Sequence, residues 1–306
     1  MMSYLPEGFL INTTENKKNI ESFENLYKAY IDHKPVEARA TYCDCAHNLH
    51  IDFGFIEGII PRQECAIGID DGSTKDIAII SRVNKPVKFF INKFEDDGNK
   101  KTAILSRKKV QEDFTHNYLS QISPGDVIDA KITHLEAFGA FCDIGCGITA
   151  LLPIDNISVS RIPHPDVRFN VGDVIKVIVK CFDELGRVTL SHKELLGTWE
   201  ENAKLFKVGE TVSGIVRSIE SYGIFIELTP NLSGLAEYTS DVCEGDCASV
   251  YIKSIIPEKM KFKIIIVDSF EAEYTKEKPH YFTTDTHMDF FRYSPENSVK
   301  TIETIF

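Results

Sequence analysis

Two short segments of the chain place aromatic rings on either side of a glycine. One runs from Phe138 through Gly139 to Phe141, and the other repeats the pattern with Tyr222 and Phe225. On a regular strand, residues three apart point to opposite faces, so two such rings share a face only if the chain bends at the glycine. Two exposed rings could each stack on an unpaired nucleobase, at about 1–3 kcal/mol per base. The alternative is that the rings belong to a hydrophobic core, and the repetition of the pattern favours an exposed pair.

Charged side chains near these rings could complete such a surface. Arg187 opens a predicted strand directly after a turn at Asp183, where its guanidinium could contact a phosphate or stack on a base. Asp183 could accept a hydrogen bond from a base or a ribose. In the alternative interpretation, Asp183 forms the turn and pairs with Arg187 on the surface, and such an ion pair contributes little to the stability of the fold. Lys261 takes the equivalent place in the second repeat, and Lys253 could assist it.

Metal binding and catalysis find little support in the sequence. The eight cysteines include close pairs such as Cys142 and Cys146, but no pair has the two-residue separation typical of zinc sites. There is no phosphate-binding Walker loop, no nucleophile elbow and no zinc-protease motif. We therefore expect no metal, no cofactor and no enzymatic activity. The net charge of −12 argues against a protein that holds duplex DNA by bulk positive charge.

The composition fits an ordinary globular protein, because hydrophobic residues make up 43% of the chain and charged residues 26%. No apolar run approaches the roughly 20 residues that are needed to cross a bilayer, and the start of the chain does not read as a secretion signal. Eight cysteines without such a signal favour a reducing, cytoplasmic location and no membrane partner.

The aromatic pairs lie within a repeated set of predicted strands. Residues 125–144 and 209–228 both open with glycine and an acidic residue, alternate apolar and polar positions, and reach the aromatic pair at the same offset. Each copy continues into further strands, and five short strands within about 65 residues suit a small closed Greek-key barrel. A more divergent copy precedes them over residues 34–108, with its first strand at residues 36–44.

Segments of helical periodicity separate these barrels and should seal their ends. The stripe before the first barrel consists of Phe23, Leu26, Tyr27, Tyr30 and Ile31. The predicted order is a helical segment at 1–33, a degenerate barrel at 34–108, a linker helix at 109–123, a well-matched barrel at 124–193, a linker helix at 194–206, a divergent barrel at 207–268 and an aromatic, acidic tail at 269–306. The tail is expected to fold back onto the third barrel or the helix before it, where it could cover that barrel's binding face.

Residues 124–193 resemble the S1 domain, an OB-fold RNA-binding repeat. The residues that carry the resemblance are Gly125, Asp126, Phe138, Gly139, Phe141, Leu151, Leu152, Val171, Gly172, Asp173, Asp183, Gly186, Arg187, Leu190, Ser191 and Lys193. The RNA surface of this family uses two aromatic residues, a histidine, an aspartate and an arginine. The resemblance implies that these roles fall on Phe138, Phe141, Pro153, Asp183 and Arg187, and the proline removes the histidine contact.

The other two copies depart further from the family. Residues 207–268 keep Tyr222, Phe225 and Lys261, whereas Glu237 at the histidine position would repel phosphate. Residues 34–108 have Ala46 and Leu49 at the aromatic positions, which favours a docking or structural domain. Its basic side chains could instead meet phosphates, and these are Lys85, Lys88, Lys93, Lys100, Lys101, Arg107 and Lys108.

The expected fold is therefore mainly β, with three tandem five-stranded OB-fold (S1-type) barrels joined by short α-helices. The resemblance implies a protein that binds single-stranded RNA, such as mRNA, in translation or mRNA handling, with the 30S ribosomal subunit or its proteins as further partners. A protein–protein adaptor that docks on the ribosome or on RNA-degradation machinery is the alternative.

Overall fold

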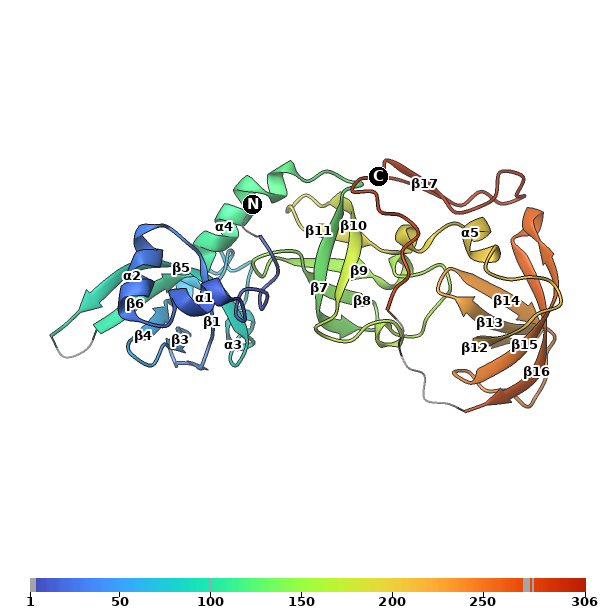
Figure 1. Ribbon diagram of the computed structural model, residues 1–306, viewed down its shortest axis with the longest axis horizontal. Coiled ribbons are helices and arrows are strands. Elements are labelled where there is room, and N and C mark those ends of the chain that lie inside the picture. The colour runs from blue at the N-terminus through green and yellow to red at the C-terminus, as the bar shows by residue number, and fades with distance from the viewer. Residues whose placement is uncertain (1–3, 99–100, 272–275, 277) are drawn as a thin grey trace. The chain divides into compact units, whose positions relative to one another are not determined.

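The structure is a computed structural model that describes residues 4–98, 101–271, 276 and 278–306 (Figure 1). By its internal contacts the chain divides into two units, residues 1–122 with 143–149 and residues 123–142 with 150–306. Among the described residues, no helix is long and apolar enough to cross a membrane.

The first unit is built on a six-stranded sheet with the order β1-β5-β6-β4-β3-β2. Its strands are β1 (Val36–Arg39), β2 (Tyr42–Cys43), β3 (Leu49–Asp52), β4 (Glu57–Ile60), β5 (Pro86–Asp96) and β6 (Lys101–Ser106). Its helical segments are α1 (Thr14–Asn19), α2 (Phe23–Ile31), η1 (Arg62–Glu64), α3 (Ile77–Ile80), α4 (Lys108–Asn117) and η2 (Leu119–Gln121).

The first predicted strand of this unit is interrupted. Its beginning, β1, pairs with β5, whereas its end, β2, pairs with β3. Between them, the N–H of Ala40 donates to the carbonyl of Lys85 at 3.1 Å, and that of Thr41 donates to the carbonyl of His50 at 2.8 Å. The chain thus changes partners at these two residues, and the sheet counts six strands where five were expected.

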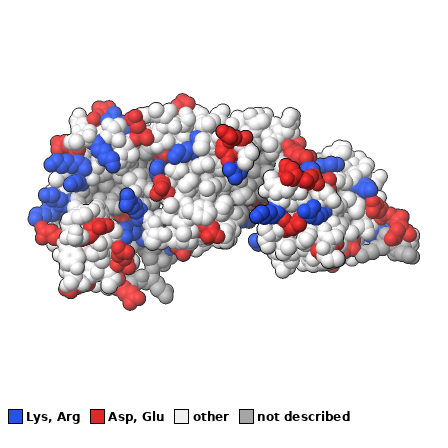
Figure 2. Space-filling view, turned by 180° about the vertical axis from the view of Figure 1, so that it is seen from behind, with Lys and Arg blue, Asp and Glu red and all other residues white. Residues whose placement is uncertain are grey.

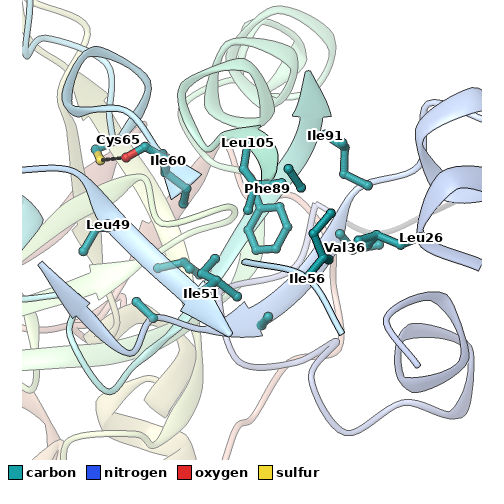
Figure 3. Packing of buried hydrophobic residues seen from close by; sticks show 14 of the residues in the cluster. Leu26, Val36, Leu49, Ile51, Ile56, Ile60, Cys65, Phe89, Ile91 and Leu105 are labelled. Atoms are coloured by element: carbon teal, nitrogen blue, oxygen red, sulfur yellow. Dashed lines mark hydrogen bonds between the residues drawn. The ribbon is translucent and has the colours of Figure 1, made fainter. Parts of the chain in front are cut away.

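Alternating residues of these strands fill the core of the first unit (Figure 3). Val36, Leu49, Ile51, Phe89 and Leu105 are all at most 1% exposed. Because strand side chains alternate between two faces, this pattern turns one face of the whole sheet inward.

Fewer residues of the apolar stripe on helix α2 are buried against this core than the sequence predicted. It begins at Phe23, after the Ser22 hydroxyl caps the helix by accepting from a backbone N–H. Leu26 is buried, but Phe23 and Tyr27 remain partly exposed and lean against Phe94 of β5, with ring centroids 5.2 and 5.8 Å apart. The stripe is wider than the helix face that meets the sheet, so its outer rings form a surface cluster.

The second unit contains two closed barrels, with the strand orders β10-β11-β9-β8-β7 and β12-β13-β14-β16-β15. We call the first of these the second barrel and the other the third barrel, because the sheet of the first unit comes before both in the chain. The second barrel consists of β7 (Val127–Glu136), β8 (Gly139–Asp143), β9 (Thr149–Pro153), β10 (Val174–Phe182) and β11 (Val188–Ser191), with η3 (Ile154–Asn156) and η4 (Pro165–Val167) between them. The third barrel consists of β12 (Thr211–Glu220), β13 (Gly223–Thr229), β14 (Leu232–Ala236), β15 (Cys247–Ile256), η6 (Pro257–Lys259) and β16 (Lys261–Phe270). The predicted class, mainly β with tandem OB-type barrels, is confirmed, and the described residues form two closed five-stranded barrels beside the six-stranded sheet of the first unit, where a third closed barrel was predicted.

The connection between these two barrels is formed by η5 (Lys193–Leu196) and α5 (Trp199–Ala203). Thr198 and Glu201 form a reciprocal capping box that fixes the start of α5. Trp199 is only 2% exposed and packs into the core of the third barrel, against Phe262. Two short helical segments thus stand where one linker helix over 194–206 was predicted, and Trp199 belongs to the core of the third barrel.

The tail reaches both barrels of the second unit, and its strands are β17 (Phe290–Arg292) and β18 (Glu303–Ile305). The N–H of Val127 in β7 donates to Thr286 at 2.9 Å, and that of Trp199 donates to Tyr293 at 2.9 Å. Contact with the third barrel and its helix was expected, whereas the run along the second barrel was not. Phe138 and Tyr222 are exposed at 55% and 68%, so the described residues of the tail do not cover these rings.

Candidate nucleic-acid interface

Each aromatic pair is set by a glycine that no other residue could replace without a shift of the backbone. A Cβ on Gly139 would lie 2.5 Å from the carbonyl oxygen of Leu152, and one on Gly223 would lie 2.5 Å from that of Ala236. Strands β8 and β13 both begin at this glycine. The chain turns just before each glycine, at residues 137–138 and 221–222, so the first ring of each pair lies in the turn and the second in the strand.

The bend places the rings of each pair at the same mutual angle. The centroids of Phe138 and Phe141 are 5.9 Å apart with an interplanar angle of 86°, and those of Tyr222 and Phe225 are 6.1 Å apart at 86°. Phe141 and Phe225 are half-buried, so packing fixes the second ring of each pair. The first ring, Phe138 or Tyr222, projects outward. Ala140 is fully buried, so the small residue of the motif faces the barrel interior.

His134 of β7 extends the aromatic surface of the second barrel and was not identified from the sequence. Its ring lies nearly parallel to that of Phe141, with centroids 6.3 Å apart and an interplanar angle of 22°. Its Nε2 lies 2.7 Å from a carboxylate oxygen of Glu136, and its side chain is 63% exposed. Thr133 donates a hydrogen bond to the carbonyl of Phe141, which aligns β7 with β8. The alternation of β7 buries residues 128, 130 and 132 and breaks at the exposed His134, so that pattern could not have revealed it.

Asp183 and Arg187 form a surface ion pair, which was the alternative to a direct RNA contact for Asp183. The Arg187 Nε donates to Asp183 at 2.6 Å, and the other carboxylate oxygen accepts the backbone N–H groups of Leu185 and Arg187 at 2.9 and 2.8 Å. These hydrogen bonds, the backbone one from Arg187 first, lower the pKa of Asp183. Asp183 therefore shapes the turn. The Arg187 side chain remains 75% exposed and accessible to a ligand.

In the third barrel, pairing brings a lysine into line with the half-buried ring. Phe225 pairs with Leu235 on β14, and Leu235 pairs in turn with Lys263 on β16. Lys261 lies two residues earlier on the same exposed side of β16, at the start of the strand. Lys253 occupies a register shift in β15 and is exposed. Of these lysines, Lys263 is the one in register with the ring, whereas the repeat pattern in the sequence indicates Lys261.

The residues that replace the family's histidine lie at the same place in both barrels. Pro153 is the last residue of β9, and Glu237 directly follows β14, one residue beyond the Ile224–Ala236 pair. Glu237 is exposed, so its carboxylate remains beside the aromatic pair of the third barrel. A negative charge at this place weakens the attraction of that barrel for phosphate.

The first unit has no ring pair at the corresponding place, as predicted from Ala46 and Leu49. Leu49 is fully buried in the core, and Ala46 lies in an exposed turn. The nearest aromatic stack joins Tyr42 to His50, at 4.2 Å and 9°. Both ring nitrogens of His50 contact carboxylates, Nε2 at 3.1 Å and Nδ1 at 2.8 Å, so this surface is acidic and unsuited to a nucleic-acid backbone.

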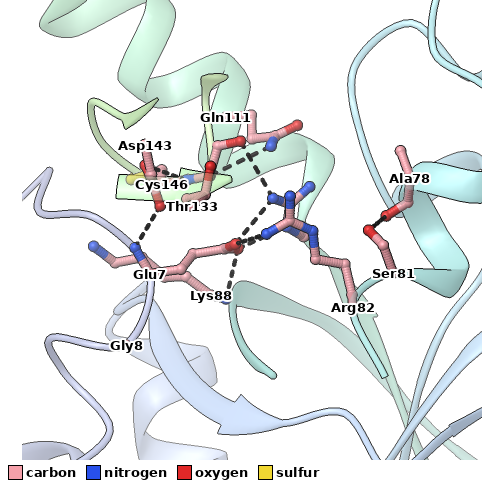
Figure 4. Close-up of polar contacts among 12 residues, drawn as sticks. Glu7, Gly8, Ala78, Ser81, Arg82, Lys88, Gln111, Thr133, Asp143 and Cys146 are labelled. Atoms are coloured by element: carbon pink, nitrogen blue, oxygen red, sulfur yellow. Dashed lines mark hydrogen bonds and ion pairs between the residues drawn. The ribbon is translucent and has the colours of Figure 1, made fainter. Parts of the chain in front are cut away.

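Two basic residues that were candidates for phosphate contacts in the first unit are buried. Lys88 is 1% exposed and Arg107 is 3% exposed. Arg107 donates to the Glu7 carboxylate at 2.6 and 3.0 Å. Arg82 also contacts that carboxylate, at 3.2 Å (Figure 4). These charges hold the start of the chain on the sheet and are not available to RNA. Lys100, another candidate, lies outside the described residues.

Charge on the molecular surface is mixed. On the face drawn in Figure 2, Lys and Arg side chains are interspersed with Asp and Glu. Within the described part of the chain, no group of three or more His, Cys, Asp or Glu side chains could hold a metal ion. Stacking and individual cations are therefore the means of binding that this surface offers.

The chain is similar to proteins with S1 domains. Residues 121–193 match the family model described as S1 RNA binding domain. Small ribosomal subunit protein bS1 of Staphylococcus aureus (strain COL) is 28% identical over 235 residues, which cover 74% of this chain and 57% of that protein. Its counterpart from Rhizobium meliloti (strain 1021) is 29% identical over 234 residues, which cover 74% and 39%. The solution structure of GSP13 from Bacillus subtilis is 29% identical with a TM-score of 0.22, and covers 23% of this chain and 55% of that chain. The chain spans about half the length of the curated relatives it matches.

Proposed function

On the premise that residues 121–193 form an S1 domain and that most of the chain is similar to ribosomal protein bS1, we propose that this protein binds single-stranded RNA without a catalytic step. The observation that carries the proposal is the repeated ring pair, Phe138 with Phe141 and Tyr222 with Phe225, each set at 86°. In each pair the half-buried ring braces the exposed one, which can then receive a base.

The second barrel is the stronger binding module in this proposal. It adds His134 beside Phe141, and it leaves the Arg187 guanidinium accessible to a phosphate or a base. The third barrel has Lys263 and Lys261 near its ring pair but also the carboxylate of Glu237. Two modules on one chain increase the overall affinity through effective concentration. Because stacking accepts every base, sequence preference should be weak.

Fluorescence anisotropy with a labelled oligouridylate tests the proposal. The double variant Phe138→Ala/Phe141→Ala should lose about 5- to 150-fold in affinity for each stacked base that is lost. Phe290→Ala serves as the matched control, because Phe290 is 50% exposed in β17 and belongs to neither ring pair. An unchanged affinity in the double variant, with the barrel still folded, would refute the proposal.

The cellular role that we propose is in translation or mRNA handling in the cytoplasm, with the small ribosomal subunit as a partner. The similarity to bS1 over 74% of this chain supports that role. Crosslinking in cells, followed by sequencing of the attached RNA, tests it. Predominant recovery of mRNA supports the role, and recovery of no RNA contradicts it.

An adaptor function is the second candidate, and the aromatic cluster of the first unit favours it. Phe23 and Tyr27 of α2 are 39% and 47% exposed, and they pack with Phe94 at the surface. Aromatic side chains of this kind are enriched in protein interfaces. Affinity capture before and after ribonuclease treatment separates the two functions. An adaptor keeps its partners after digestion and loses them in Phe23→Ala/Tyr27→Ala, whereas an RNA-bridged complex disperses.

A further inference from the structure

The carboxylate of Glu237 belongs to the same outer face of the third barrel as the ring pair. Ile224 and Ala236 are cross-strand partners and are buried, at 0% and 3% exposure. Because side chains alternate along a strand, the next residues, Gly223 and Glu237, both belong to the outer face. Continued by one step, the same pairing sets Glu237 opposite Gly223, which has no side chain to cover the carboxylate.

This position brings Glu237 within reach of a base that is stacked on the rings. Phe225 pairs with Leu235, so it is the diagonal neighbour of Glu237 across the two strands. Diagonal neighbours lie about 7–8 Å apart, which a long side chain can span. Tyr222 directly precedes the glycine and is 68% exposed. A base on this ring pair would therefore have the Glu237 carboxylate beside it.

The Glu237 carboxylate is available to a ligand. Glu237 is exposed, and among the described residues no hydrogen bond or ion pair engages its carboxylate. In the second barrel the same place is taken by Pro153, whose side chain neither donates nor accepts a hydrogen bond. The ring pair of the third barrel therefore has a free acceptor beside it that the ring pair of the second barrel lacks.

A second carboxylate flanks the glycine from the opposite strand. Glu220, the last residue of β12, is exposed and is the cross-strand partner of Gly223. The second barrel has its counterpart in Glu136, the last residue of β7. A carboxylate at this place is thus common to both barrels, and Glu237 is the one that distinguishes the third barrel from the second.

A carboxylate beside a stacked base selects that base by its hydrogen-bond donors. An ionised carboxylate only accepts, and it does so through two oxygens. Guanine presents two adjacent donors on its Watson–Crick edge, the N1–H and the N2 amine, and these match the two oxygens. Adenine, cytosine and uracil each place an acceptor beside their donor, and that acceptor would face the negative charge. Guanine is therefore the base that this arrangement favours.

We propose that Glu237 makes the third barrel selective for guanine, which stacks on Tyr222 and Phe225 and donates from its Watson–Crick edge to the carboxylate. Lys263, in one row with Phe225, would meet the phosphate. The inference rests on the proposed RNA-binding function and deepens it. The second barrel, with Pro153 at this place, accepts every base alike.

Fluorescence anisotropy of the full chain with labelled hexauridylate, and with the same strand carrying one central guanosine, tests the selectivity. A bidentate pair with a base gives a preference of about 5- to 150-fold, so the guanosine strand should bind at least fivefold more tightly. Inosine, which lacks the N2 amine, should lose part of this preference. Equal affinity for guanosine and inosine, or for guanosine and uridine, overturns the inference. Failure of every strand to bind contradicts RNA binding itself.

Variants then assign the selectivity to Glu237. In Glu237→Gln the preference for guanosine should disappear, whereas the affinity for hexauridylate should rise, because a charge that repels phosphate is gone. Opposite changes for the two strands cannot come from a loss of folding. Glu220→Gln is the matched control, since it removes the same charge on the other side of Gly223 and should keep the preference. Loss of the preference in both variants, or in Glu220→Gln alone, overturns the inference.

The double variant Phe138→Ala/Phe141→Ala locates the selectivity in one barrel, because it keeps only the rings of the third. The preference for guanosine should persist in it, even where the overall affinity for RNA falls. A preference that is present in the parent and absent from this double variant belongs to the second barrel, and that result also overturns the inference.

Discussion

Phe225 and Lys263 lie in one row across the third barrel, because both are register partners of Leu235 on the strand between them. The row runs from the half-buried ring on β13 to the exposed amine on β16. An RNA strand with a base on the Tyr222–Phe225 pair would therefore pass its backbone within reach of Lys263. The register thus joins a stacking group and a charge that are 38 positions apart in the sequence.

The first prediction concerns that amine. Lys263→Ala should weaken RNA binding several-fold at low salt and should reduce the salt dependence by the equivalent of one phosphate contact, a slope of about 0.7 for a single strand. Affinity measured by anisotropy across a salt series checks this. Lys259→Ala is the control, since Lys259 lies in η6 outside the row. If both variants give the same slope as the parent, Lys263 makes no phosphate contact.

The glycine bend of the second barrel gives a second prediction. Gly139→Ala places a Cβ 2.5 Å from the Leu152 carbonyl, which is backbone and cannot move aside cheaply. We expect a loss of about 1–3 kcal/mol in the free energy of unfolding, together with displaced rings and weaker RNA binding. Denaturant unfolding followed through Trp199, the only tryptophan of the chain, measures it.

Gly186→Ala is the comparison for this variant. Gly186 has a φ of +72° but no atom within 4 Å of an added Cβ, so only the backbone conformation opposes the change. Its cost should be about 1 kcal/mol, and RNA binding should change less than in Gly139→Ala. Equal losses in the two variants would show that the approach of Leu152 is unimportant.

The third prediction concerns the buried charges of the first unit. Glu7→Gln removes the carboxylate that pairs directly with the buried Arg107, since both side chains are 4% exposed in the pair. We expect the first unit to lose about 3–5 kcal/mol of stability. The exposed pair of Lys93 and Glu95 offers the control, and Glu95→Gln should cost less than about 1 kcal/mol. Hydrogen exchange of the β5 amides reports on this unit, and similar protection in both variants would contradict the prediction.

The barrels and ring pairs could be predicted because their causes are local in the sequence. Alternation with period two reveals which residues face the core, and the glycine between the rings marks the bend. Lys263 follows from the same alternation once Lys261 is placed on the outer face. His134 does not follow from alternation, because the buried positions of β7 are 128, 130 and 132 and the exposed residue 134 breaks that pattern.

The buried ion pairs could not be predicted, because they are contacts between residues that are distant in the sequence. Arg107 is paired with Glu7, 100 positions away, and a sequence pattern presents both as surface charges. Arg168 and Glu227 are 59 positions apart and meet only when the second and third barrels pack together. The course of the tail along β7 likewise depends on tertiary packing, not on its own periodicity.

The last prediction is the pH dependence that His192 gives to the second unit. Its pKa is about 4 in the folded protein and about 6.5 when unfolded, because burial disfavours the charged ring. Above pH 6.5 His192 is neutral in both the folded and the unfolded chain, so its titration does not reduce the stability of the second unit. As the pH falls from 6.5 to 4, the unfolded chain takes up a proton that the folded chain refuses, which removes up to about 3 kcal/mol.

Denaturant unfolding between pH 7 and pH 4.5, followed through the Trp199 fluorescence, measures this loss. His192→Phe should abolish the part of the stability loss that His192 causes, because phenylalanine does not titrate. His116→Phe, at an exposed position of α4, should leave the pH dependence of the second unit unchanged. If the parent and His192→Phe lose stability in parallel over this range, then His192 titrates equally in both states and is not held neutral by burial.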